Sequence, residues 1–148
     1  MSHQLMGQVL SRMGIVSAID IDEILTEQEH SRRRFGEIAL AWGLCQPEHI
    51  GEAWFEQLIQ EGGRVDLDTI GIDPMAPAYL GGSTARRLGV IPIRMLGALA
   101  VVAASRDMNS LQYAELSQTL GRQVRIVHAD AAQVEAAIER HYPLTAVA

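Results

Sequence analysis

Residues 5–28, which read LMGQVLSRMGIVSAIDIDEILTEQ, and residues 34–57, which read RFGEIALAWGLCQPEHIGEAWFEQ, share one spacing. A shift of 29 positions superimposes six pairs of identical residues: Gly7 and Gly36, Gly14 and Gly43, Ile21 and Ile50, Glu23 and Glu52, Glu27 and Glu56, and Gln28 and Gln57. The positions between these pairs agree in polarity. Two copies of one segment can form a surface with approximate two-fold symmetry. Such a surface suits either a two-fold symmetric ligand or packing of the copies against each other.

Each copy is predicted to be a hairpin of two helices. Apolar residues recur at helical spacing at the start of the first copy, and Gly14 then ends that helix. Asp20 is predicted to be the N-cap of the next helix, with Glu23 three positions later as its capping-box partner. In the second copy we expect one helix over residues 32–42 and another over residues 47–60.

The sequence Glu61-Gly62-Gly63 predicts a boundary, because the helical periodicity stops there. After it we expect strands over residues 65–68, 90–95, 98–104 and 123–128, and helices over residues 73–88, 110–120 and 130–142. The predicted fold class is α+β, with N-terminal tandem helical hairpins followed by a small two-layer α/β sandwich. The corresponding domains are residues 1–60 and 61–143, followed by a tail over 144–148.

Composition excludes several classes of function. The chain has 148 residues and a formal net charge of −6, which disfavours a general DNA or RNA binder. All twelve basic residues are arginine, so no lysine is present to bind a nucleotide phosphate or to form a Schiff base. Cys45 is the single cysteine and excludes an internal disulfide. No apolar run predicts a membrane span, and the first residues do not resemble a signal peptide, so we expect a cytoplasmic protein.

Catalytic and metal-binding patterns are also missing from the sequence. The five histidines are scattered, and none lies in HExxH or near the cysteine at ligand spacing. Asp66 and Asp68 could pair as catalytic carboxylates, but exposed charges beside Leu67 are the simpler interpretation. We therefore expect no metal, no nucleophile–base pair and no enzymatic activity in this chain.

The second half of the chain carries a series of short motifs. They read VDLD (65–68), GIDP (71–74), ARRLGVIPIR (85–94), LAVVAAS (99–105), QVRIV (123–127) and AAIERHY (136–142). With the repeat before them, they make residues 5–142 similar to the N-terminal domain of type II secretion and type IV pilus assembly ATPases. The ATPase motif G-x-x-x-x-G-K-[ST] is absent. The resemblance implies a regulatory domain with an attached or partner ATPase. Because similar domains occur at the ends of membrane glycosyltransferases, such an enzyme is the other expected partner.

The repeat itself resembles the MshEN-type subclass, whose tandem motif reads RLGxx[LVI][LVI]xxG[LVI][LVI]xxxxLxxxLxxQ and which binds cyclic di-GMP. The main departure is Leu5, where the motif has arginine. The resemblance implies a cyclic di-GMP site with these candidate residues: Met6, Gly7, Leu10, Gly14, Ile21, Leu25, Gln28, Arg33, Arg34, Phe35, Gly36, Gly43, Ile50, Trp54 and Gln57.

These residue types suit such a ligand. The planar guanidinium of Arg34 can meet guanine O6 and N7 together, and a glutamine amide can bind an adjacent base edge. Glycine lets a base or phosphate approach the backbone, and Trp54 can cover a guanine face. Without an arginine at position 5, one guanine lacks its bidentate guanidinium contact. This loss weakens the free energy of binding by about 1–3 kcal/mol. Arg32 and Arg33, in the joint between the copies, are the cations that could replace it.

The repeated residues also have simpler interpretations that involve no ligand. The repeated glycines can be helix starts and C-caps, the glutamines can lie on solvated helix faces, and the tryptophans can be core residues. The alternative function is a protein-docking adaptor without a small ligand. It would bind an inner-membrane platform protein or a membrane-associated secretion or glycosyltransferase component. In either case the resemblance implies a peripheral location at the inner membrane through partners, without direct membrane insertion.

Overall fold

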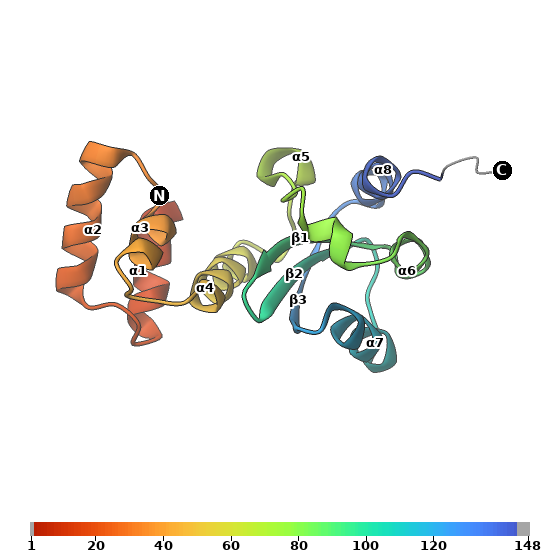
Figure 1. The fold of residues 1–148 in the computed structure, drawn as a ribbon, viewed down its shortest axis with the longest axis horizontal. Helices are drawn as coiled ribbons and strands as arrows, with labels where there is room; N and C mark the ends of the chain where they lie inside the picture. Colours follow the sequence, from red (N-terminus) through yellow and green to blue (C-terminus); the bar gives the residue numbers. More distant parts are fainter. Residues whose placement is uncertain (1, 145–148) are drawn as a thin grey trace. The chain divides into compact units, whose positions relative to one another are not determined.

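The computed structural model describes residues 2–144, with side chains from Met6 onward. The chain forms two compact units, Met1–Glu61 and Gly62–Ala148 (Figure 1). The first unit is entirely helical, and the second holds a small sheet with helices. The predicted α+β class, with helical hairpins before a small sheet, is confirmed. The predicted tail over 144–148 lies outside the described residues apart from Leu144.

The helical unit contains α1 (Ser2–Arg12), α2 (Ala18–Ser31), α3 (Phe35–Ala41) and α4 (Pro47–Gln60). Helix α1 packs against α3 and α4, and α2 packs against α3. Exchange of the two copies relates α1 to α3 and α4 to α2. The α1–α4 contact is therefore equivalent to the α3–α2 contact. The two hairpins therefore interlock in the way expected of copies related by an approximate two-fold axis.

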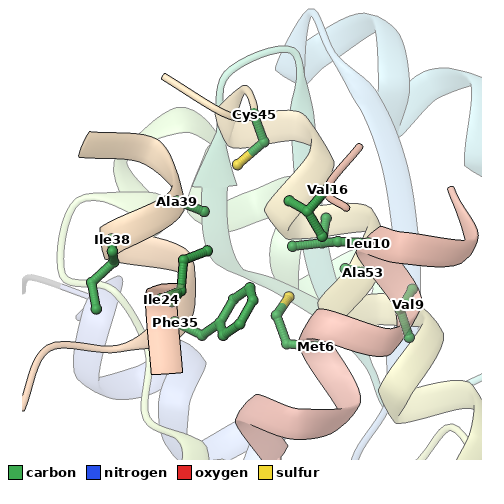
Figure 2. Packing of buried hydrophobic residues seen from close by; sticks show 10 residues of the cluster. All are labelled: Met6, Val9, Leu10, Val16, Ile24, Phe35, Ile38, Ala39, Cys45 and Ala53. Atoms are coloured by element: carbon green, nitrogen blue, oxygen red, sulfur yellow. The ribbon is translucent and has the colours of Figure 1, made fainter. Parts of the chain in front are cut away.

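Apolar side chains from all four helices form one core in this unit (Figure 2). Leu10, Ile24 and Ile38 are fully buried, and the Phe35 ring lies among them with 2 % of its surface exposed. Complete burial of one such side chain contributes about 1.5–3 kcal/mol. Cys45 belongs to the same core, and this burial raises the pKa of its thiol. Mutual packing of the copies is thus the main source of stability in the unit.

The repeat extends to individual backbone hydrogen bonds. The Ile15 N–H donates to the Leu10 carbonyl at 2.9 Å, and at the equivalent place the Leu44 N–H donates to the Ala39 carbonyl at 3.0 Å. Each of these bonds lies at the C-terminal end of the first helix of its hairpin and spans a glycine with positive φ. The two copies therefore share one local structure as well as one sequence spacing.

The N-terminus of α2 corrects one prediction. Its N-cap is Ser17, whose hydroxyl accepts from the Asp20 N–H at 3.1 Å. The Asp20 carboxylate accepts from the Ser17 N–H at 2.9 Å in return, so Asp20 is the capping-box partner and not the cap. The equivalent bond in the second copy runs from the Gln46 N–H to His49 Nδ1 at 2.9 Å.

The predicted helix over 32–42 is also wrong at its start. Helix α2 continues to Ser31, and α3 begins only at Phe35. Arg32 has φ 59° and ψ 18°, a left-handed conformation that ends α2 and separates the two helices.

The second unit contains α5 (Leu67–Ile70), the 3-10 helix η1 (Ala76–Tyr79), α6 (Gly82–Leu88), β1 (Val90–Leu96), β2 (Leu99–Ala104), α7 (Ser110–Leu120), β3 (Gln123–His128) and α8 (Ala131–His141). The strand order is β1-β2-β3. Strands β1 and β2 form an antiparallel hairpin, and β2 and β3 are parallel, joined by the α7 crossover. The central strand β2 is buried along its whole length.

Two predictions fail in this unit. Residues 65–68 form no strand, because Asp66 caps α5 and accepts from the Asp68 N–H at 3.0 Å, and Gln133 Oε1 accepts from the Leu67 N–H at 3.0 Å. Within this segment, only the Val65 N–H makes a strand-like bond, to the His128 carbonyl at 2.8 Å. The region 73–88 is not one helix. It divides into η1 and α6, because Pro77 has no N–H to donate and Gly81 is extended, with ψ 148°. None of the helices in residues 2–144 is long and apolar enough to cross a membrane.

Candidate functional site

The first repeated glycine of each copy allows close packing within its hairpin. A Cβ added to Gly7 would lie 3.1 Å from Phe35 Cζ and 3.6 Å from Ile21 Cγ1. A Cβ added to Gly36 would lie 3.2 Å from Ile50 Cδ1. In each copy the glycine therefore faces the isoleucine 14 positions later and permits close helix packing.

The second repeated glycine of each copy lies at the surface. Gly14 has φ 77° and Gly43 has φ 73°, and an added Cβ would meet no atom within 4 Å at either position. Both are exposed. Their shared role in this structure is to turn the chain from the first helix of the hairpin to the second.

Several candidate residues are core residues in this structure. Leu10 is fully buried, Phe35 is 2 % exposed, Gln57 is 5 % exposed, and Met6 is also buried. A motif match cannot separate these positions from surface positions, because packing between the copies and ligand contact both require repeated residues. They support the shape of the unit and offer little surface to a ligand.

Four apolar candidates form the half-exposed edge of the core. They are Ile21, Leu25, Ile50 and Trp54, and all four pack against the buried cluster. Ile21 is equivalent to Ile50, and Leu25 to Trp54, so the edge presents two similar apolar areas. Each area leaves part of its apolar side chains open to solvent.

The joint between the copies holds the polar candidates. Gln28 Nε2 donates to the Arg33 carbonyl at 3.1 Å, and Ser31 Oγ accepts from the Arg33 N–H at 3.3 Å. The Arg33 guanidinium points along α3 and donates to the Glu37 carbonyl at 3.4 Å. Gln28 and Arg33 are therefore partly committed to holding the joint in place.

Arg34 is the N-cap residue of α3 and caps it without a side-chain hydrogen bond. Its side chain is exposed. Within the described part of the chain, neither the Arg32 nor the Arg34 guanidinium has a hydrogen-bond or ion-pair partner. Both are available to an anion or a base edge. The side chain of Leu5 lies outside the described residues.

Sequence reasoning named Arg32 only as a substitute, and missed that its backbone is unusual. No sequence signal marks a left-handed arginine, because helices normally end there with glycine or asparagine. Among the described residues, no group of three or more His, Cys, Asp and Glu side chains could hold a metal ion. The candidate site therefore consists of guanidinium groups, an amide and an apolar edge.

Comparison with known proteins gives two kinds of match. A family model described as the MshEN domain matches residues 61–148. The solved structure of MshE with cdg, that is cyclic di-GMP, is similar with a TM-score of 0.51 and 25 % sequence identity, covering 93 % of this chain and 98 % of that chain.

Two crystal forms of the XpsE N-terminal domain were also found. They have TM-scores of 0.48 and 0.48, sequence identities of 12 % and 13 %, and cover 94 % and 91 % of this chain and 94 % and 93 % of theirs. No curated protein matches the chain. The family model covers more than half of the sequence, and the chain belongs to the MshEN domain family.

Proposed function

We propose that this chain is a non-catalytic regulatory domain that binds cyclic di-GMP through its helical unit. The observation that carries the proposal is the repetition of the two hairpins down to equivalent hydrogen bonds. The likeness to MshE with cyclic di-GMP supports it. Because that likeness covers 93 % of the chain, it must include most of the helical unit that the family model leaves out.

Symmetry links this unit to the ligand. Cyclic di-GMP has two guanines and two phosphates related by a two-fold axis. The interlocked hairpins offer two equivalent environments, each with an apolar edge residue, Leu25 in one copy and Trp54 in the other. A guanine ring on each edge would bury an aromatic face against apolar side chains, which is favourable in water.

Arg34 supplies the specific contact in this proposal. Its exposed guanidinium is a planar fork that matches guanine O6 and N7. Position 5 is leucine, whereas the motif has a second guanine-binding arginine there. One missing bidentate contact costs about 1–3 kcal/mol, so we expect a complex roughly tenfold to hundredfold weaker than one with both forks.

Isothermal titration calorimetry of the 148-residue chain with cyclic di-GMP tests the proposal. Wild type should release heat, and Arg34→Ala should weaken binding roughly tenfold to hundredfold. Arg12→Ala is the matched control, because it removes the same charge from an exposed position in the same unit. Saturating ligand should also raise the melting temperature of wild type. Absence of heat at high micromolar ligand would end the proposal.

Regulation would follow from clamping the hairpins, which changes how an attached or partner enzyme is held. The enzyme classes in this proposal are a secretion or pilus ATPase and a membrane glycosyltransferase. The domain would act in the cytoplasm, at the inner membrane through those partners. Linkage requires that the partner and the ligand alter each other's affinity by the same factor.

A second candidate function, protein docking without a ligand, has one observation in its favour. Met13 and Trp42 occupy equivalent positions at the ends of α1 and α3, and they are 40 % and 43 % exposed. A pair of large apolar side chains at equivalent positions suits a partner protein surface. A domain that gives no heat with cyclic di-GMP, but binds an inner-membrane platform protein until Trp42 is changed to glutamate, would establish the adaptor instead.

A further inference from the structure

Arg32 has a backbone conformation that is otherwise found only at glycines in residues 2–144. With φ 59° it is the single non-glycine residue with positive φ among the residues that the structure describes. The other residues with positive φ are glycines, including those that end the first helix of each hairpin. A side chain in the left-handed region brings Cβ close to the following carbonyl, so this arginine strains the joint. The end of α2 explains the left-handed conformation, but it does not explain why an arginine occupies a position that suits glycine.

The joint around Arg32 is held firmly. The Arg32 N–H donates to the Gln28 carbonyl at 2.9 Å, and the Gln28 side chain donates to the Arg33 carbonyl at 3.1 Å. Ser31 Oγ accepts from the Arg33 N–H. One glutamine thus binds the backbone on both sides of the left-handed residue and fixes where its side chain begins.

The three arginines of the joint divide into two roles. Arg33 turns back to the Glu37 carbonyl of α3. Arg32 and Arg34 are exposed and have no partner in residues 2–144 as described. Their Cα atoms are at most about 7 Å apart, since two residues of extended chain span no more. Two unpaired arginine side chains therefore start from neighbouring points of the backbone, in a protein whose formal net charge is −6.

We propose that Arg32 binds a phosphate of the nucleotide whose guanine Arg34 reads. This inference rests on the proposed function and assigns a second ligand residue within it. In a nucleotide, the phosphate and the base belong to one short unit, so a cation beside the base-reading arginine can reach the phosphate. A guanidinium meets two phosphate oxygens in a bidentate pair, which is stronger than a neutral hydrogen bond. The left-handed backbone separates Arg32 from Arg33 and leaves it free for that contact.

Two ligands separate the roles of the arginines. Cyclic di-AMP has the same phosphates as cyclic di-GMP, with adenine in place of guanine. Arg32→Ala should lower the affinity for both ligands about tenfold and leave the preference for guanine unchanged. Arg34→Ala should reduce that preference. Binding by Arg32→Ala should also depend less on salt than wild-type binding, because a charged contact is gone. Arg12→Ala should match wild type throughout.

Two further variants test the strain. Arg32→Gly should raise the melting temperature of the free protein by on the order of 2 °C and still weaken cyclic di-GMP as much as Arg32→Ala. Arg32→Lys should keep most of the affinity, because an ammonium also binds phosphate as a point charge. A purely structural role for Arg32 would not be rescued by lysine while glycine gives a more stable protein that binds less tightly.

The outcomes distinguish this inference from the proposed function. If wild type binds cyclic di-GMP and Arg32→Ala binds it equally well, the phosphate role is wrong and the proposed function stands. If Arg32→Ala reduces the guanine preference instead of the overall affinity, Arg32 reads a base and the assignment is also wrong. Absence of wild-type binding overturns both proposals.

Discussion

Gly14 and Gly43, 29 positions apart in the sequence, share one left-handed backbone conformation, with φ 77° and 73°. Each follows the first helix of its hairpin, and each is flanked by the same pattern of backbone hydrogen bonds. The two glycines show that the repeat preserves the place where each hairpin turns.

Alanine at either glycine should destabilise the protein to the same extent. Because an added Cβ meets no atom within 4 Å at Gly14 or Gly43, the loss comes from the backbone conformation alone. We expect each change to lower the free energy of unfolding by about 1 kcal/mol, measured by urea denaturation. Asparagine at the same positions should cost less, because it tolerates the left-handed region. A much larger loss at one glycine than at the other would show that the turns are not equivalent.

The first repeated glycines should behave differently from each other. Gly7→Ala places Cβ 3.1 Å from the Phe35 ring, which is buried and cannot move freely. We expect overpacking to cost about 1–3 kcal/mol, and the helix gain of about 1 kcal/mol from replacing glycine should offset only part of it. Gly36→Ala places Cβ 3.2 Å from the end of Ile50, which is half-exposed and can change rotamer. A helix gain of about 1 kcal/mol should then make Gly36→Ala nearly neutral in the same urea measurements.

A double mutant checks the cause of the Gly7→Ala loss. Phe35→Leu removes the ring that the new methyl group would meet, so the two changes together should cost less than the sum of the single changes. Additive losses would mean that the Phe35 ring is not what opposes a side chain at position 7. The same cycle at Gly14 and Phe35 should be additive, because an added Cβ at Gly14 meets no atom within 4 Å.

The sequence was sufficient for the parts of the fold that local chemistry decides. Glycines at equivalent positions predicted where each hairpin turns, and the spacing of Gln28 and Gln57 defined two equal copies. The strands of the hairpin and the final strand also follow from apolar runs between glycine turns. These features depend on neighbours within a few residues of each other.

The rest depends on contacts between distant segments. Periodicity marks an apolar face on α1, but not that this face meets α4 rather than α2. Apolar and polar residues alternate over 65–68 as in a strand. However, the Leu67 N–H donates to Gln133 Oε1, and no local sequence pattern predicts that hydrogen bond. Likewise, the repeat named Gln57 as a site residue, although it is 5 % exposed. Repetition alone cannot tell a shared packing role from a shared ligand role.

Tyr142 should make the stability of the second unit depend on alkaline pH. Its hydroxyl donates to the Pro77 carbonyl at 2.6 Å, and burial raises its pKa from 10.0 to about 12. The unfolded chain therefore loses this proton at lower pH than the folded chain. Stability from Tyr142 is complete below about pH 10 and is lost as the pH rises towards 12. The chain has no lysine that would titrate in the same pH range and obscure the effect of Tyr142.

Tyr142→Phe should have two effects in urea denaturation at pH 7, 9 and 11. At pH 7 it should lower the free energy of unfolding by about 1 kcal/mol, because the buried Pro77 carbonyl loses its donor. Between pH 9 and 11 the variant should lose less stability than wild type. Tyr79→Phe is the matched control, since Tyr79 is 46 % exposed and its ring lies against Arg122. If wild type and Tyr142→Phe lost stability in parallel up to pH 11, the hydroxyl of Tyr142 would not be the group that resists ionisation in the folded chain.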